Sequence, residues 1–367
     1  MEQSASLLQL AFRKFRKNSW GFYSFVFICI CVGVAIFAYV LAPDNSRNAN
    51  QMHLSIHSKN PGFRVQMLTI PSEVTTQSYF DVLFFGDTSP DLQIPIYSYR
   101  EVEQGIEIVE YTPDGSPGLV KTYSLELFPD VTSSEEIQTK YISDKTFWLG
   151  TDKYGRDLLS RILVGMRISL AIGFIAVLIS LILGITLGAI AGYFGGKMDA
   201  VIMWLINVTW SIPTLLLVIA ITLALGKGFW QVFVAVGLTM WVEVARVVRG
   251  QVMSVKQMQY VTAAHALGFK DFRIVTRHVL PNSLAPVIII SAANFASAIL
   301  VESGLSFLGI GAQPPMPSWG GIIKDHYAHI VLGKPFLALI PGIAIMSLVT
   351  AFMLIGNALR DALDVRN

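Results

Sequence analysis

The sequence predicts an all-α membrane protein with six spanning helices and a β-rich domain inserted between the first and second helices. Hydrophobic residues make up 53% of the 367 residues and charged residues only 14%, whereas soluble domains carry about 25% charged residues. Several uncharged runs reach the length of about 20 residues that crosses a bilayer. One polar stretch, 43–148, separates the first of these runs from the others. A net charge of +2 gives no indication of nucleic-acid binding.

The first span is predicted at 22–41, directly after the basic sequence RKFRK. A secretory signal peptide is the alternative, but its apolar core is usually only about 7–15 residues long. The sequence AYVLAP is also a weak cleavage site. We therefore expect a retained helix. The remaining spans are expected at 168–191, 201–225, 229–242, 284–308 and 336–357. The span 229–242 is short, and it extends to residue 245 if Glu243 faces protein rather than lipid.

The distribution of Lys and Arg predicts that both chain ends lie in the cytoplasm, because basic residues near span ends tend to stay inside. The predicted short outer loops contain Lys227, Lys324 and Lys334. The predicted inner segments contain more: Arg13, Lys14, Arg16, Lys17, Lys197, Arg246, Arg249, Lys256, Lys270, Arg273, Arg277, Arg360 and Arg366.

The segment 43–148 has the pattern of short strands and hairpins. Runs such as FRVQMLTI, YFDVLFFG, LQIPIYSY, IEIVEY and VKTYSLELF are separated by the turn formers GDTSPD and TPDGSPG. A small β-rich outer domain is predicted, with a disordered linker as the alternative. The segment contains no recognisable metal, nucleophile or phosphate-loop motif. Contact with a delivery protein and packing over the mouth of a pathway remain two possible roles.

A charged segment, 260–282, with the sequence YVTAAHALGFKDFRIVTRHVLPN, interrupts the apolar spans. Gly268 is suited to end one helix, and Pro281 is expected to stop a second. Apolar stripes are predicted on both halves. One consists of Val261, Ala264 and Leu267, and the other of Phe272, Val275 and Val279. The segment is either an interfacial helix on lipid or a rigid hook that passes force from a soluble motor.

The charged segment resembles the EAA loop of ABC importer permeases, in which Glu-Ala-Ala is followed by Gly and later by Leu-Pro. The matching positions are Thr262, Ala263, Ala264, Gly268, Ile274, Leu280 and Pro281. Thr262 replaces the glutamate of the pattern. Three further stretches, 149–170, 302–320 and 339–366, resemble dipeptide and oligopeptide permeases. The long connection 43–148 departs from that family.

The resemblance implies the six-helix type I ABC importer fold, with the sequence divided into three parts. These are residues 1–42 with the first helix, the extracytoplasmic insert 43–148, and the core 149–367 with a cytoplasmic coupling loop at 246–283. The implied location is the plasma (inner) membrane. The implied partners are a second permease, two ATP-binding cassette subunits that use ATP and Mg²⁺, and an outer substrate-binding protein. The implied ATPase-contacting residues are Thr262, Ala263, Ala264, Leu267, Gly268, Phe272, Val275 and Pro281.

Polar residues within the spans are candidates for the translocation path, and internal hydrogen bonding is the alternative for each. They are Asn207, Thr209 and Ser211, which lie with Pro213 on the third predicted span, and Asn294 and Glu302 on the fifth. Glu243 is instead expected to pair with Arg246, three residues later, at the cytoplasmic edge. No metal site is predicted, since His265 and His278 lie in separate helices without a visible third ligand.

Small residues at Gly184, Gly188 and Gly192 predict a helix-packing face. Asp152, Arg156 and Asp157 are expected to form a structural turn on the outer surface, where they cap the second span and pair locally.

The sequence contains neither GxxxxGK[ST] nor HExxH, so no catalytic site is predicted and any ATP hydrolysis is expected in partner subunits. The expected cargo is a di- or oligopeptide, with nickel or another small solute as the alternative. An ion-coupled secondary transporter and a membrane enzyme are the rival classes. A secondary transporter usually needs carboxylates near the middle of the membrane, and Glu302 is the one candidate in the sequence.

Overall fold

The computed structural model describes residues 7–72, 77–131, 133–226 and 228–363. They form two compact units. The helical unit consists of residues up to 31, 169–313 and the part of the chain from 342 onward, and the sheet unit consists of 32–168 and 314–341. Lys227 and Arg366, which belong to the charge argument, lie outside the described residues.

Five helices are long and apolar enough to cross a membrane in the described part of the chain. They are α2 (Ser19–Ile36), α6 (Leu158–Phe194), α9 (Phe229–Lys256), the continuous helix Asp271–Phe307 that ends with α12 (Leu280–Phe307), and α14 (Phe336–Leu363). Two short helices flank α2, namely α1 (Leu7–Lys17) and α3 (Ala38–Leu41). The helices overlap five of the predicted spans, and most of them extend well beyond the predicted ends. Polar turns at a helix end lower the hydropathy, so a hydropathy pattern does not include them.

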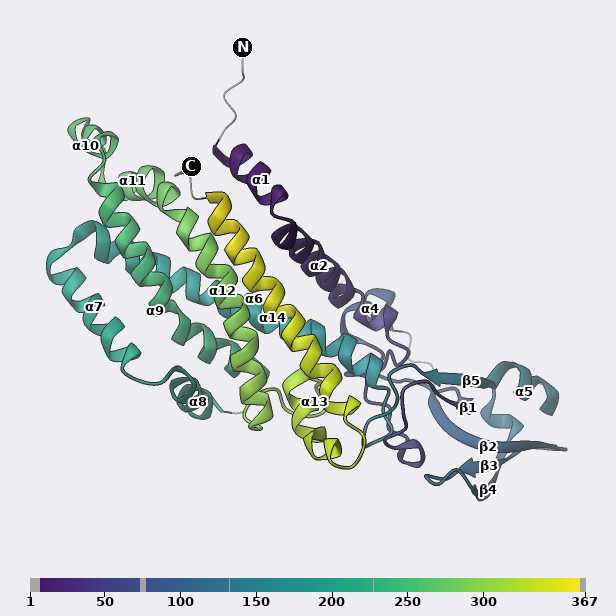
Figure 1. The fold of residues 1–367 in the computed structure, drawn as a ribbon. Helices are drawn as coiled ribbons and strands as arrows, with labels where there is room; N and C mark the ends of the chain where they lie inside the picture. The colour runs from purple at the N-terminus through teal and green to yellow at the C-terminus, as the bar shows by residue number, and fades with distance from the viewer. Residues whose placement is uncertain (1–6, 73–76, 132, 227, 364–367) are drawn as a thin grey trace, which may run out of the picture. The chain divides into compact units, whose positions relative to one another are not determined.

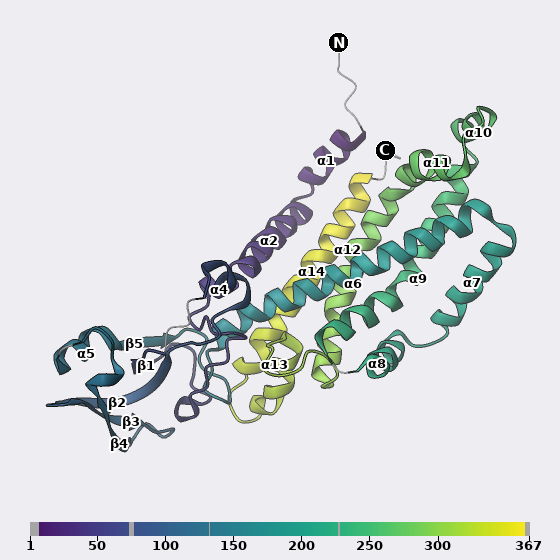
Figure 2. The same ribbon diagram turned by 180° about the vertical axis from the view of Figure 1, so that it is seen from behind.

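The remaining predicted span, 201–225, is not one straight helix. It is divided into α7 (Gly196–Trp210) and α8 (Thr214–Leu225), which are bent by 94° relative to each other (Figures 1 and 2). Pro213 lies at the break and lacks the N–H that would continue the helix. The Ser211 hydroxyl donates to the Val208 carbonyl at 2.7 Å, which satisfies one acceptor at the end of α7.

The predicted glycine face on α6 is confirmed as a packing surface against α9. A β-carbon at Gly184 would lie 2.5 Å from the Val244 Cβ, and one at Gly188 would lie 2.5 Å from the Ala245 carbonyl oxygen. Both distances are shorter than van der Waals contact, so only glycine permits this approach of the two backbones. A bidentate pair joins α7 to α9, in which Arg249 Nε lies 2.5 Å and Nη2 2.6 Å from the carboxylate oxygens of Asp199.

The sheet unit contains one five-stranded antiparallel sheet with the strand order β4-β3-β2-β1-β5. Its strands are β1 (Phe63–Ile70), β2 (Leu92–Val102), β3 (Gly105–Tyr111), β4 (Pro117–Ser124) and β5 (Ile142–Phe147). The side chains of β1 alternate between two apolar clusters. Leu68 packs with Ile96 and Ile137, the last from α5 (Ser134–Tyr141), whereas Val65 and Met67 pack with Phe147. Alternation in the sequence therefore predicts both faces of this strand.

Two local expectations for this region are wrong. The run 79–86 forms a helix, α4 (Tyr79–Phe85), which is capped by Gly86 in a left-handed conformation. Its aromatic residues favour strands only where a neighbouring strand supports them, and α4 packs near α3 instead. The end of the run 120–128 leaves β4 as a 3₁₀ turn, η2 (Leu125–Leu127).

Asp152, Arg156 and Asp157 form a turn, but it is buried rather than on the surface. Arg156 Nε lies 2.6 Å from Asp152, and its Nη1 donates to Asn50 at 2.9 Å. Asp157 accepts the Ser160 backbone N–H at 2.8 Å and so caps the start of α6. Arg156 thus pairs locally with Asp152 and also donates to Asn50, a contact between distant parts of the sequence that local spacing does not reveal.

Trp319, at the start of α13 (Trp319–His326), also contacts α6. Its indole N–H donates to the Ile162 carbonyl at 3.0 Å, and Gly165 leaves room for the ring. The side chain is fully buried. This contact fixes residues far apart in sequence within the sheet unit.

Gly188→Val is expected to lower the thermal stability of the purified protein, because the added side chain must displace the α9 backbone at Ala245. Overpacking of this kind costs about 1–3 kcal/mol. The matched control is Gly250→Val in α9, where a β-carbon has nothing within 4 Å. Thermal unfolding in detergent measures both variants, and equal melting temperatures for the two would contradict the packing role.

Protonation of His53 is expected to destabilise the sheet unit in acid. Burial, followed by the charge of Lys145, lowers the pKa of His53 from 6.5 to about 4. Since the unfolded chain binds this proton at a higher pH, stability is full above pH 6.5 and falls as the pH drops toward 4. The loss is on the order of 3 kcal/mol.

Hydrogen exchange of β1 and β5 at pH 7 and pH 4.5 measures this loss. His53→Gln should reduce the pH dependence, and His57→Gln, at an exposed histidine, should leave it unchanged. An unaltered pH dependence in His53→Gln would exclude His53 as its origin.

Candidate functional site

The charged segment folds back on itself at Gly268. Its first half is α10 (Gln259–Ala266), separated from α9 by a short turn, and its second half begins with α11 (Asp271–Ile274). Gly268 has a φ of 78°, which an L-residue with a side chain rarely adopts. The Phe269 N–H donates to the Ala264 carbonyl at 3.2 Å across this glycine. The predicted glycine turn is therefore present.

Pro281 does not stop the second helix, contrary to the expectation. The helix runs without a break from Asp271 to Phe307 and passes through a π-helical turn, η3 (Val275–Val279). The Leu280 N–H donates to the Val275 carbonyl, five residues earlier. This wider turn accommodates a proline that lacks an N–H and would clash with the carbonyl of a regular turn.

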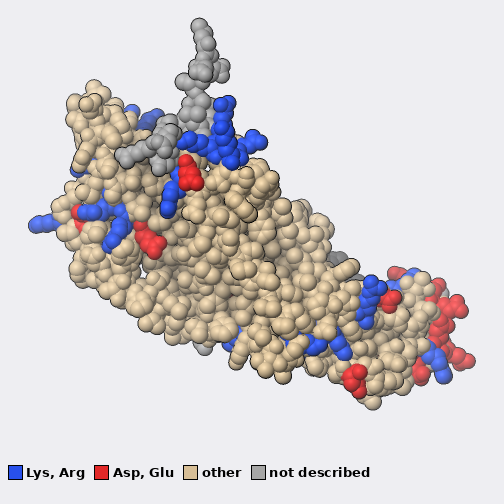
Figure 3. Space-filling model, in the orientation of Figure 1, with Lys and Arg blue, Asp and Glu red and all other residues tan. Residues whose placement is uncertain are grey.

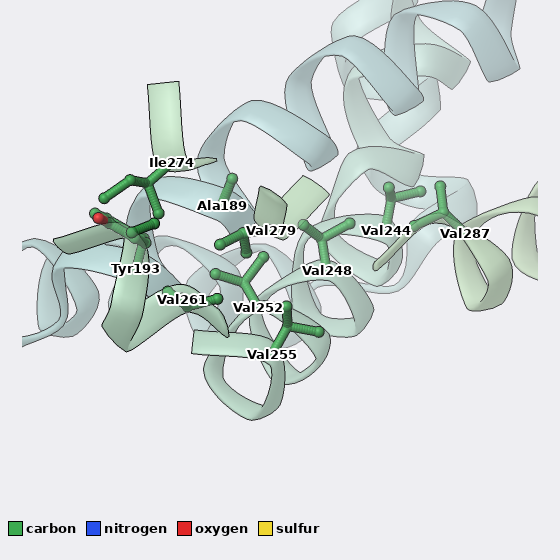
Figure 4. Close-up of a cluster of buried hydrophobic side chains, with 11 residues drawn as sticks. Ala189, Tyr193, Val244, Val248, Val252, Val255, Val261, Ile274, Val279 and Val287 are labelled. Atoms are coloured by element: carbon green, nitrogen blue, oxygen red, sulfur yellow. The ribbon is translucent and has the colours of Figure 1, made fainter. Parts of the chain in front are cut away.

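One face of the charged segment is buried in the helical unit. Val261 and Ala264 from α10 join Ile274 and Val279 in a cluster with the ends of α6 and α9 (Figure 4). The members contributed by α6 and α9 include Ala189, Tyr193, Val248, Val252 and Val255. Burying four apolar side chains fixes the position of both halves of the segment. The segment is therefore packed onto protein, which argues against a loose helix on lipid.

The opposite face presents large apolar side chains at the turn. Leu267 is 74% exposed and Phe272 is 80% exposed. Neither predicted stripe is continuous, because Val261, Ala264 and Val279 turn inward. Of the other predicted contact residues, Val275 is half-buried and the following are exposed: Thr262, Ala263, Gly268 and Pro281. Fixed apolar side chains around a rigid turn are suited to docking into a groove of a partner.

Tyr193, which the sequence analysis missed, connects the end of α6 to both halves of the segment. Its hydroxyl donates to Asp271 at 2.8 Å and lies 3.1 Å from His265 Nε2. The Tyr193 and His265 rings stack with their centroids 6.2 Å apart. Lys256 donates to the Tyr193 carbonyl at 2.5 Å. These contacts join the end of α6 to α9 and to both halves of the charged segment. The proximity of Tyr193 is a tertiary fact with no local sequence signal.

The predicted path residues fall into two groups. Asn207 and Ser211 are exposed beside the break between α7 and α8. Asn294 is 1% exposed and Glu302 is fully buried, so neither faces an open surface of this chain. Glu302 accepts a hydrogen bond from the Ser306 hydroxyl at 2.7 Å. The Ser306 hydroxyl oxygen in turn accepts one from the Ala312 N–H at 3.1 Å. Glu302 thus supports the turn after α12.

A cavity of about 230 Å³ opens at the break between α7 and α8. It is lined by residues of α7, α8, α9 and α12: Thr209, Trp210, Thr214, Leu217, Thr239, Met240, Glu243, Ser297 and Val301. Four of the lining residues carry hydroxyl groups. Sequence analysis identified Thr209 but missed most of the others, because they come from four helices and no single helix carries the pattern.

The expected ion pair between Glu243 and Arg246 is not formed in the described part of the chain. The Arg246 guanidinium instead lies over the Trp210 ring, 3.6 Å from its centroid. A guanidinium on the face of an indole is stabilised by the ring quadrupole. The i, i+3 spacing would allow the ion pair with Glu243. The Arg246 guanidinium instead stacks on Trp210, which lies on a different helix.

Ile274→Ala is expected to loosen the charged segment, whereas Phe272→Ala is expected to leave it folded. Ile274 is fully buried and its truncation leaves a cavity that costs about 2–5 kcal/mol. Phe272 is mostly in contact with solvent. Hydrogen exchange of residues 259–279 in lipid nanodiscs should rise in the first variant only. Equal exchange in both would show that the inward face does not hold the segment.

Comparison with known proteins agrees with this arrangement. Residues 184–366 match the family described as binding-protein-dependent transport system inner membrane component, and residues 6–60 match the N-terminal TM domain of oligopeptide transport permease C. The glutathione transport system permease protein GsiD of Pectobacterium atrosepticum is 42% identical over 59% of this chain and 72% of its own. The dipeptide transport system permease protein DppC of Alkalihalophilus pseudofirmus is 43% identical over 59% of this chain and 71% of its own.

Among solved structures, the chain is similar to the MetNI methionine ABC transporter in an inward-facing conformation. The identity is 18%, the TM-score is 0.45, and the likeness covers 55% of this chain and 96% of that one. The relatives and the matched family models establish the family independently of that likeness. The chain belongs to the inner-membrane permease components of binding-protein-dependent transport systems.

Proposed function

We propose that this chain is the membrane-spanning permease subunit of an ATP-driven importer of di- or oligopeptides. The observation that carries the proposal is the charged segment, a rigid turn whose inner face is packed onto α6 and α9 while Leu267 and Phe272 remain exposed. The glutathione and dipeptide systems named for its relatives support a peptide cargo.

In this proposal the protein crosses the inner membrane six times, with α7 and α8 together forming one bent span. Irregular backbone at membrane depth is tolerated where it lines a cavity, and a cavity lies at this break. Basic side chains gather at the end of the helical unit where α1 and α11 lie (Figure 3). The positive-inside rule then places both termini and the charged segment in the cytoplasm. The 43–148 segment lies outside.

Two cytoplasmic ATPase subunits, which bind ATP and Mg²⁺, dock beneath this chain and a second permease. Leu267 and Phe272 enter a groove of one ATPase. Closure of the ATPases on ATP favours one arrangement of the charged segments, and the difference in binding energy shifts the permeases between inward and outward states. Tyr193 and the buried valines transmit this movement to α6 and α9.

A substrate-binding protein delivers the cargo from outside, where the sheet unit offers additional contact area. Thr262 stands where the EAA pattern has glutamate, so the ion pair which that glutamate would form is absent from this ATPase contact. Apolar contact through Leu267 and Phe272 supplies the docking energy instead.

The test is ATP-driven uptake of a labelled peptide into vesicles that contain this chain, its partner permease, the ATPases and the binding protein. Leu267→Asp with Phe272→Asp is expected to reduce uptake at least 10-fold, because a charge in an apolar groove is not solvated. Gly268→Pro should do the same, since proline cannot adopt the turn. Val331→Asp, at another apolar residue that is 91% exposed, is the matched control for ATPase docking and should still copurify with the ATPases.

Copurification of the ATPases separates lost docking from lost folding. The double aspartate variant should retain the partner permease and lose the ATPases. Uptake that continues without ATP and follows an ion gradient would establish a secondary transporter instead. ATP-driven uptake of Ni²⁺ but not of the peptide would assign the cargo to the metal.

A further inference from the structure

Glu243 lies at the middle of a helix that is long and apolar enough to cross a membrane. It follows Phe229 by 14 residues and precedes Lys256 by 13 in α9. At 1.5 Å per residue this is about 20 Å from either end. The sequence predicts that it lies near the cytoplasmic edge of the span. A carboxylate within an apolar spanning helix is costly unless it faces water or meets a cation.

The basic residues that follow Glu243 on α9 are engaged elsewhere. Arg246 lies over Trp210, and Arg249 forms its bidentate pair with Asp199. Among the described residues, no ion pair includes Glu243. Its side chain is exposed and borders the cavity at the break between α7 and α8. The geometry therefore keeps this carboxylate available to a cation from outside the chain.

The other polar groups around the cavity also favour a cation. The hydroxyl of Thr209 donates to the Leu205 carbonyl at 2.9 Å, and that of Thr239 donates to the Val236 carbonyl at 2.8 Å. With their protons used within their own helices, both hydroxyls offer lone pairs to the cavity. The residues that line it include no Lys, Arg or His. The site is rich in acceptors, which suits a donor-only group such as an ammonium.

We propose that this cavity binds the amino-terminal ammonium group of the transported peptide, with Glu243 as its counter-ion. The inference rests on the proposed function and adds a recognition site within the permease itself. Ligand pockets for whole small molecules are usually about 300–1,000 Å³, so a cavity of about 230 Å³ holds one end of a peptide. Arg246, held on Trp210, leaves the carboxylate free for this contact.

The test is protection of a cysteine in the cavity of the assembled transporter in nanodiscs, without ATP or binding protein. Ser297→Cys, which lines the cavity, is introduced after Cys29 and Cys31 are changed to Ala. Millimolar dialanine should slow maleimide labelling at least 3-fold, and N-acetyl-dialanine, which lacks the ammonium, should not. Glu243→Gln should abolish the protection, and Glu243→Asp should restore part of it.

A second reporter, Val331→Cys, controls for effects of the peptides on the reagent and should label equally under all conditions. Equal protection by both peptides, no protection with Glu243 present, or full protection in Glu243→Gln would each overturn the inference. ATP-driven uptake by the same cysteine-replaced transporter is measured in parallel. If ATP-driven uptake is present but the peptide does not protect the cysteine, the proposed function stands and only this inference fails. Uptake driven by a pH gradient without ATP and lost in Glu243→Gln would assign a proton to Glu243 and overturn both proposals.

Discussion

The close contact between α6 and α9 supports both functional parts of the helical unit. Glycines on α6 let the two backbones approach to a distance that a β-carbon would prevent. The contact continues into the cluster in which Tyr193 and the α9 valines bury the inner face of the charged segment. Glu243, next to the buried Val244, borders the cavity. One helix, α9, therefore leads into the proposed docking turn at its end and carries the candidate recognition group at its middle.

The break between α7 and α8 is the second constraint. A regular helix satisfies its backbone internally, and a break at membrane depth needs other partners or a polar cavity. Here Ser211 satisfies one carbonyl, and the chain opens a cavity lined by hydroxyl groups. Trp210, the last residue of α7, holds the Arg246 guanidinium on its ring. Glu243 is therefore the charged residue that lines the cavity. The break between α7 and α8 and the carboxylate of Glu243 therefore meet at the same cavity.

The sheet unit depends on a different kind of interaction. Asp152 and Arg156 form a buried pair, and hydrogen bonds to other groups help to offset the cost of burying its charges. Asn50 accepts one from Arg156, and the carbonyl of Ala49 accepts one from the neighbouring Arg161 at 3.3 Å. The network ties the chain that follows α3 to the start of α6. A long insertion can thus be carried without loosening the helix that it precedes.

Hydropathy and local chemistry were enough to predict the apolar helices, the packing glycines on α6, the turn at Gly268 and β1. Each depends on residues close in sequence, such as a period of two for β1 or the freedom of glycine at positive φ. Residues 79–85 had the composition of a strand, yet without a neighbouring strand they form a helix. Pro281 had the local signal of a helix end, yet a π-helical turn carries the helix through it.

Only the tertiary structure decided which acid is satisfied and which is available. Glu302 and Glu243 both lie in apolar helices, and the sequence left Glu302 with two roles, a path residue or a partner for the turn that follows it. Ser306 and the turn after α12 enclose Glu302. Local spacing predicts that Arg246 pairs with Glu243. Arg246 stacks instead on Trp210, which lies 33 residues before Glu243 in the sequence. The availability of a charge depends on contacts between helices, and no local pattern in the sequence encodes them.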